Sequence, residues 1–465
     1  MDSRVIVAAL VLGLAVLASV YMPSIGQIAL LFMIFAAAGI FLILKWPPIG
    51  LGALILVGMM VPFDIQAGLD SRINITLLII TLLAGLWLMR LLVGVGQIRA
   101  ISSKAMPPVI ALVASALLSF GAGQLQWFRF SQPAPLIAQV GGLAVFLLSA
   151  AVFVLAANQI EDLKWIRILT WLFLALGALH VHGGLAPGFG RFILPLFRRG
   201  ATGSIFWIWL IALAFSQAIF NHRLQVRWRL ALGTLVLATM YVALVPNRSW
   251  VSGWLPPLIG ILIILWAGAP RFAAIATLAG GVILALNYRE FIDFLLINED
   301  YSILTRWEAW RIILDMIRTS PILGFGPANY RAYTPNFPIL GWSVPFSSHN
   351  QYVDILAQTG LLGLVAFIWF AWAVGRIGWR LRALAPMGFE RAFVLGSLGG
   401  LAGTLASGMF ADWVLPFVYN ITLSGMRSSV LAWLFLGALV GMERAFQGSS
   451  LESVAQRLPM GIANE

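Results

Sequence analysis

The sequence predicts an all-α, polytopic membrane protein with about 12–14 transmembrane helices and one large external loop that contains a short amphipathic helix. Of its 465 residues, 61% are hydrophobic and only 10% are charged, whereas about 25% of residues are charged in a soluble domain. Its apolar runs reach the ~20 residues that cross a hydrocarbon core. These runs are continuous rather than alternating, which predicts helices and not a barrel.

Membrane-spanning helices are predicted along the whole chain, with a gap before the last three. They cover about fourteen segments: 5–21, 26–44, 48–63, 74–93, 107–121, 136–157, 168–182, 204–220, 230–246, 250–268, 272–287, 356–374, 392–410 and 428–443. The first segment is expected to stay as a membrane helix and not to be removed as a signal peptide. Residues 1–465 are therefore interpreted as a single integral membrane domain, with 288–355 as an external loop that carries part of an active site.

The charge distribution predicts which side each loop occupies. The net charge is +12, but the basic residues are scattered in short loops, as the positive-inside rule predicts and a nucleic-acid-binding patch would not. With the N-terminus in the cytoplasm, 17 of the 29 basic residues lie inside, including every lysine. The loop 301–349 is then external. The chain has no cysteine, which excludes disulfides and thiolate metal sites.

The basic residues on the predicted external side are all arginine. They gather at Arg198 and Arg199, at Arg248, and between Arg306 and Arg331. The planar guanidinium group binds phosphate oxygens in pairs, whereas a lysine acts as a mobile point charge. An arginine-only exterior therefore indicates a diphosphate site. The alternative is that these arginines pair with carboxylates nearby in the sequence.

The external loop has two predicted helices. Residues 305–317 have the apolar spacing of an amphipathic helix that lies at the membrane surface. After an aromatic stretch at 335–345, Ser347 or Ser348 is expected to cap a second helix. In its first turn, His349 and Tyr352 lie three residues apart and would share one face.

His349 is the candidate general base. Its ordinary pKa near 6.5 suits proton transfer at neutral pH, and the alternative is a structural histidine at the membrane interface. The other histidines, His180, His182 and His222, are interpreted as structural, because no Glu or Cys completes a zinc-binding pattern around them.

Several runs resemble the signature of the bacterial O-antigen ligase and O-antigen polymerase superfamily. These are His349-Asn350 followed by Gly360-x-x-Gly363; the pattern Arg306, Trp310, Pro321-x-x-Gly324-x-Gly326 and Tyr330; the segment Asn247-Arg248-Ser249-Trp250; and the segment Arg199-Gly-Ala-Thr202-Gly203. The last segment has one more residue between Arg and Thr than the family pattern, and the Asn-Pro-Asn that follows in the family is absent.

The resemblance implies a glycosyltransferase whose donor is a glycan on undecaprenyl diphosphate. It implies His349 as the catalytic base, with Arg248 and Arg306 holding the donor diphosphate. Further candidates for substrate binding are Tyr352, Arg199 and Arg311. No metal and no cofactor are implied, and a single displacement would invert the anomeric configuration.

The implied partners are the lipid-linked donor, a glycan or lipid A core as acceptor, and the surrounding lipids, with no nucleic acid. The implied location is the bacterial inner membrane, with the active site on the external face. The alternatives are a transporter or flippase of the same lipid-linked sugars, or a structural or receptor-like protein. A flippase would carry ionisable groups along its spans, whereas these spans are nearly uncharged. The sequence leaves open ligase or polymerase, sugar, linkage and oligomeric state.

Overall fold

The computed structural model describes residues 37–61, 64–66, 72–93, 102–197, 203–297 and 303–455. The chain divides into two compact units, Met1–Ala53 and Leu54–Glu465, and each is described by itself. In the first unit, residues 37–45 are helical and helix α3 (Pro48–Met60) begins. The second unit holds the remaining helices and the candidate site.

Helices account for nearly all of the second unit. In order they are α4 (Ile75–Val93), α5 (Met106–Ala122), α6 (Leu136–Gln159), α7 (Leu163–Leu185), α8 (Pro187–Ile193), α9 (Ser204–Phe220), α10 (Val226–Leu244), α11 (Val251–Gly268), α12 (Pro270–Leu286), α13 (Tyr288–Ile297), α14 (Ile303–Ile317), α15 (Tyr330–Tyr333), α16 (Gln351–Leu384), α17 (Phe389–Ser407) and α18 (Met426–Ala455). Short 3₁₀ turns η1 (Leu194–Phe197), η2 (Thr334–Asn336) and η3 (Leu423–Gly425) join some of them. Strands β1 (Asp64–Gln66) and β2 (Arg72–Asn74) form one antiparallel pair.

The all-α membrane fold is confirmed. In the described part of the chain, seven helices are long and apolar enough to cross a membrane, or eight if α12 and α13, bent by 75°, form one span. Three shorter apolar helices are α3, α5 and α9. Each predicted span from 48–63 onward coincides with a helix. The predicted span 5–21 lies outside the described residues, as does 26–44 up to residue 36.

The spans pack around α17 and α18. Helix α17 lies against α9, α11 and α16, and α18 lies against α6 and α9. The apolar part of α18 is 94% buried, so this helix lies in the interior of the unit. Aromatic stacking fills the core, with ring centroids 5.3 Å apart for Trp209 and Phe435 and 5.1 Å apart for Phe370 and Trp433.

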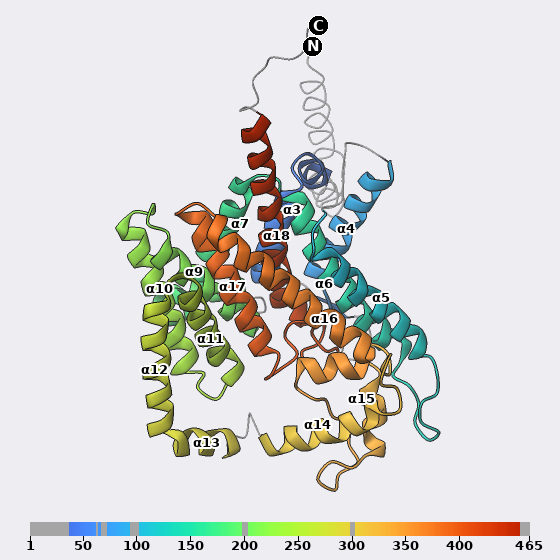
Figure 1. Cartoon of the computed structure of the whole chain (residues 1–465). Coiled ribbons are helices and arrows are strands. Elements are labelled where there is room, and N and C mark those ends of the chain that lie inside the picture. Colours follow the sequence, from blue (N-terminus) through green and yellow to red (C-terminus); the bar gives the residue numbers. More distant parts are fainter. Residues whose placement is uncertain are drawn as a thin grey trace, which may run out of the picture. The chain divides into compact units, whose positions relative to one another are not determined.

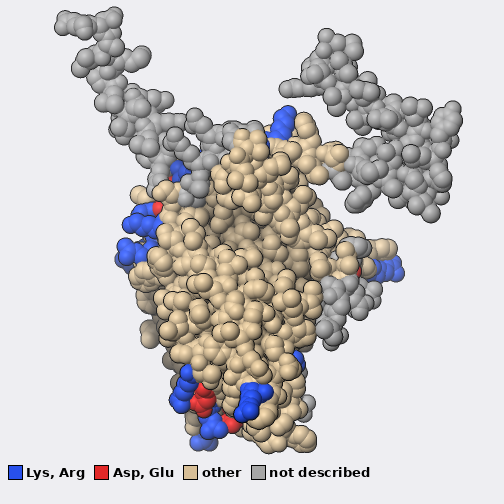
Figure 2. Space-filling view, turned by 90° about the vertical axis from the view of Figure 1, so that its right-hand side faces the viewer, with Lys and Arg blue, Asp and Glu red and all other residues tan. Residues whose placement is uncertain are grey.

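The long loop, which the sequence predicts to be external, lies at one end of the long helices. Figure 1 shows α13 and α14 running across the ends of the spans, nearly perpendicular to α12. The predicted amphipathic helix 305–317 is confirmed as α14, which begins two residues earlier. Figure 2 shows one face with a broad expanse free of charged side chains, and charges gathered at its edges and its lower end. This distribution fits a protein with lipid around its middle.

Helix α16 is broken at Gly360, and this break anchors the long loop that precedes it. Gly360 has φ 63° and ψ −165°, a conformation that is essentially restricted to glycine. The carbonyls of Ala357 and Gln358, left open by the break, accept hydrogen bonds from the amides of Phe325 and Gly326 at 2.9 and 3.0 Å. In return, two amides of α16 donate to the loop: Leu361 N to Pro321 O at 2.9 Å, and Leu362 N to Ile322 O at 3.3 Å.

The loop and the helix thus exchange hydrogen bonds as two β-strands would, inside a helical protein. We refer to segment 321–326 and the break at Gly360 together as the splice. The splice gives a physical reason for the Pro-x-x-Gly-x-Gly pattern and for the first glycine of Gly-x-x-Gly. Gly324 also has a positive φ of 64° and lies against the backbone of Ala357 and Gln358.

Candidate active site

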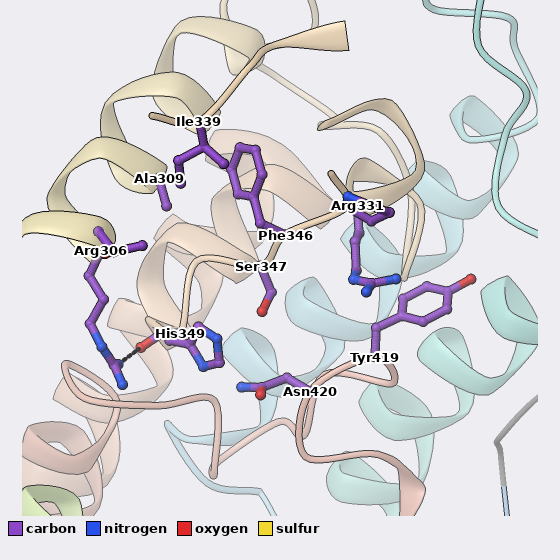
Figure 3. A pocket seen from close by; sticks show the side chains of 11 residues that line it. Arg306, Ala309, Arg331, Ile339, Phe346, Ser347, His349, Tyr419 and Asn420 are labelled. Atoms are coloured by element: carbon purple, nitrogen blue, oxygen red, sulfur yellow. Dashed lines mark hydrogen bonds between the residues drawn. The ribbon is translucent and has the colours of Figure 1, made fainter. Parts of the chain in front are cut away.

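A cavity of about 290 Å³ lies where α14, the segment before α16 and the loop after α17 meet. Its walls come from Thr305, Arg306 and Ala309 on α14; from Arg331, Ile339, Pro345, Phe346, Ser347 and His349; and from Tyr419 and Asn420. Figure 3 shows His349, Arg331, Ser347 and Asn420 directed toward a common space, with the Tyr419 ring beside the Arg331 guanidinium. The cavity therefore brings together groups that are up to 115 residues apart in the sequence.

His349 does not lie on α16. Helix α16 begins at Gln351, and its N-cap is Asn350, whose side-chain oxygen accepts from the amides of Tyr352 and Val353 at 3.0 and 3.2 Å. His349 precedes this cap with φ 49°, in the left-handed region. The predictions that Ser347 or Ser348 caps the helix and that His349 and Tyr352 share one face are therefore wrong. The backbone bends at His349. The His349 imidazole points into the cavity, whereas the Tyr352 side chain points toward α17.

A buried network beneath His349 holds this backbone. The Ser348 hydroxyl lies 2.8 Å from Asp354 Oδ1 and 2.9 Å from the Asn350 carbonyl oxygen, and it accepts from the Asn350 amide. The Tyr330 hydroxyl donates to the Asp354 carboxylate and accepts from the Ser348 amide. Burial, followed by the nearby carboxylate, raises the pKa of Tyr330 well above its ordinary value, so its hydroxyl stays a donor. Surrounding structure of this kind can maintain a strained residue that costs ~1–3 kcal/mol.

Arg306 and Trp310 fasten α14 to the backbone segment 348–349, which we call the strap. Arg306 Nη1 donates to the His349 carbonyl at 3.3 Å and to the Phe410 carbonyl at 2.7 Å. Trp310 Nε1 donates to the Ser348 carbonyl at 2.7 Å. Arg306 therefore joins three segments, and at the same time lines the cavity beside the imidazole.

His349 is neutral in this environment. Burial, and to a lesser degree the positive charge of Arg306, lowers the pKa of His349 from 6.5 to about 4. A neutral imidazole at neutral pH has a lone pair that can accept a proton, as a general base must. An anion bound beside Arg306 would offset its charge and raise the pKa of His349, which would make the imidazole a stronger base.

The opposite wall is formed by Arg331, Tyr419 and Asn420. The Arg331 guanidinium lies over the Tyr419 ring, 4.9 Å from its centroid. The Asn420 side-chain NH₂ donates to the carboxylate of Asp412, which also accepts from the Phe417 amide at 2.7 Å. Asp412 is fully buried, and burial raises its pKa from 3.8 to about 6, so this carboxyl group is ionised at neutral pH. These contacts fix the loop that carries Tyr419 and Asn420.

The site residues predicted from the sequence divide into two groups. His349 and Arg306 lie together in the cavity. Arg248 is exposed, and its guanidinium lies 5.4 Å from the ring centroid of Phe294 on α13, away from the cavity wall. Arg311 is exposed and pairs with Glu308 at 2.8 Å. The Tyr352 hydroxyl donates to the Leu405 carbonyl at 2.7 Å. Arg199 lies outside the described residues.

Sequence reasoning missed Tyr419, Asn420 and Asp412, and it named Arg331 only as one of the external arginines. Asp412 offered a signal, because an isolated carboxyl group between apolar runs is costly unless it has a function or a partner. Tyr419 and Asn420 offered none, since they belong to a short loop without a recognisable pattern. In the described part of the chain, no three His, Cys, Asp or Glu side chains are grouped as metal ligands would be.

Comparison with known protein families gives a match for the part of the chain that holds His349. Residues 196–368 match a family model described as O-antigen ligase, which confirms the resemblance to the O-antigen ligase and polymerase superfamily. The matched region contains α9 to α14, the splice and His349. Tyr419, Asn420 and Asp412 lie beyond it. No curated protein matches the chain.

Proposed function

With residues 196–368 matching the O-antigen ligase family as the premise, we propose that the protein is a glycosyltransferase of surface polysaccharide assembly. It moves a glycan from an undecaprenyl-diphosphate donor to an acceptor hydroxyl. The acceptor is a growing glycan in a polymerase or lipid A core in a ligase. The observation that carries the proposal is a neutral, half-buried His349 with a left-handed backbone conformation, which lines the same cavity as Arg306.

The proposed reaction is one displacement at the anomeric carbon. His349 takes the proton of the acceptor hydroxyl as its oxygen attacks. The bond from the anomeric carbon to the diphosphate oxygen breaks, and its electron pair stays on the diphosphate. Fixed positive charge near that oxygen stabilises the charge that develops there. Attack from the side opposite the leaving group inverts the configuration, without a metal ion.

Arg306 has two parts in this proposal. Its Nη1 bonds to two carbonyls hold the strap that carries His349, and its charge favours an anionic donor in the cavity. Arg248 is proposed as a second ligand of the diphosphate, acting from its place against Phe294 outside the cavity wall. Arg199, Arg311 and Tyr352 stay proposals for secondary contacts to substrate.

The proposed location is the bacterial inner membrane, with the cavity on its external face. The all-arginine loops on that side support this orientation, because lysine is confined to the predicted cytoplasmic loops. The polyprenyl chain would lie in lipid between spans while the diphosphate reaches the cavity. The exposed aromatic stretch that includes Trp342 is proposed to stack on sugar rings outside the cavity.

The test replaces His349 with alanine in cells that lack the chromosomal copy. We expect His349→Ala to abolish surface glycan on a gel while membrane-inserted protein stays at the normal level. The matched control is His182→Ala, because His182 is an exposed histidine near the end of a span and lies outside the cavity. Normal glycan in His349→Ala cells would refute the catalytic role.

A further inference from the structure

The cavity contains two guanidinium groups that differ in what they contact. Arg306 is held by two carbonyl oxygens on its Nη1 atom. The Arg331 guanidinium has neither a hydrogen bond nor an ion pair with any described residue, and its contact is the Tyr419 ring. An arginine presents five N–H donors, so a half-buried guanidinium on a cavity wall needs a ligand or water to satisfy them. Arg331 therefore has donors available to substrate, whereas Nη1 of Arg306 is already bonded to two carbonyl oxygens.

Arg331 is also held in place before a ligand arrives. Its guanidinium is supported by the aromatic face of Tyr419, an arrangement that favours a cation. Tyr419 in turn packs against Phe417, at 5.9 Å between centroids, and Phe417 stacks on the buried ring of Tyr330 at 5.0 Å. Because Tyr330 also supports the His349 strap through Ser348, the same buried tyrosine sets the position of both walls.

The residues around Arg331 indicate the sign of the ligand. None of the residues that line the cavity is Asp or Glu, while the wall carries two arginines. Asn420 adds a hydrogen-bond acceptor to this wall. Its NH₂ group donates to the Asp412 carboxylate, which can only accept, so its carbonyl oxygen is left to accept a hydrogen bond. A ligand that complements this wall has an anionic group next to a hydroxyl, as a sugar diphosphate has.

We propose that Arg331, supported on Tyr419, binds the diphosphate of the donor, and that Asn420 accepts a hydrogen bond from a hydroxyl of the first donor sugar. This inference rests on the proposed function and assigns the leaving-group side of the cavity. The acceptor then enters on the His349 side. When the bond to the diphosphate oxygen breaks, the negative charge develops near the Arg331 fork, which pairs with two phosphate oxygens at once.

The test measures binding of inorganic pyrophosphate to the purified full-length protein by calorimetry. We expect Arg331→Gln to weaken binding by about tenfold or more, the effect of losing a charge-assisted hydrogen bond. Arg331→Lys should be weakened less, because it keeps the charge and loses the fork. The control is Arg318→Gln, which removes one positive charge from an 83% exposed side chain of the same external segment and should bind as the wild type does.

The outcomes separate this inference from the proposed function. If His349→Ala loses transfer and keeps pyrophosphate binding, while Arg331→Gln loses that binding at an unchanged melting temperature, both stand. Undiminished binding by Arg331→Gln overturns the assignment of Arg331 alone. If Arg331→Gln instead loses affinity for methyl glucuronide and keeps affinity for pyrophosphate, Arg331 recognises an acidic sugar and the assignment is wrong. A wild-type protein that does not bind pyrophosphate overturns it as well.

Discussion

Replacing Gly360 with alanine tests the splice directly. A Cβ atom at Gly360 would overlap the Ile322 carbonyl oxygen and lie 2.5 Å from the Leu323 nitrogen. The unfavourable backbone conformation alone costs ~1–3 kcal/mol. Separating the two segments removes four hydrogen bonds, each contributing ~0.5–1.5 kcal/mol. We therefore expect Gly360→Ala to lower the free energy of unfolding by about 3–9 kcal/mol, a large part of the ~5–15 kcal/mol that stabilises a typical protein.

The assay is thermal unfolding of the purified protein in detergent, followed by size-exclusion chromatography of what remains in solution. The matched control is Gly375→Ala, farther along α16, where an added Cβ would make only an ordinary contact with Leu401 at 3.6 Å. There alanine should raise helix stability by ~0.5–1 kcal/mol. Our account of the splice would be refuted if Gly360→Ala unfolded at the same temperature as Gly375→Ala.

Three further predictions concern the cavity. His349→Gly should fold, because glycine fits the left-handed backbone at this position. It should lack transfer activity and regain part of it with added imidazole. A folded variant that imidazole does not rescue in a vesicle assay would argue against a base at this position. Stability should respond to acid in opposite directions through two groups. The pKa of His349 is about 4 in the fold against 6.5, so the unfolded chain binds the proton first and acidification destabilises the fold. The pKa of Asp412 is about 6 against 3.8, so the folded protein binds the proton first and acidification stabilises it. Each effect amounts to about 3 kcal/mol. On acidification from pH 6.5 to pH 4, the stability of Asp412→Asn should therefore fall relative to the wild type and that of His349→Gly should rise relative to it. Parallel pH profiles from thermal unfolding would contradict both assignments. Arg306→Lys should lose about tenfold in activity, since one ammonium group cannot reproduce the two carbonyl contacts of Nη1; wild-type rates in the same vesicle assay would exclude this.

The helices were predictable because their signal is local. Hydropathy alone placed α9 over 204–220, with the bounds that the structure has, and spacing placed α14. That His349 belongs to the candidate site was predictable from its residue type and from its place in the long loop. Its geometry was not, because the competition between Ser348 and Asn350 for the cap depends on two other residues. Asp354 binds the Ser348 hydroxyl, and Tyr330 accepts a hydrogen bond from the Ser348 amide.

The partners of His349 across the cavity were harder to predict for a related reason. Arg331 and Arg248 look alike in the sequence, since both are arginines of the predicted external side. What separates them is the position of the loop after α17, which Gln351 ties to the start of α16 through the amides of Val414 and Leu415. Contacts between segments more than sixty residues apart leave no periodic pattern in one sequence.

The cavity of about 290 Å³ is at the small end of the range of ligand sites, which is ~300–1,000 Å³. A space of this size encloses the atoms next to the bond that forms and leaves the rest of a long saccharide in solvent. Chains of ten units and of a hundred units would therefore present the same surface to these walls. In the proposed reaction, such a site would join two chain ends without contacting the rest of either chain. Any control over product length would then be exerted by features outside the cavity.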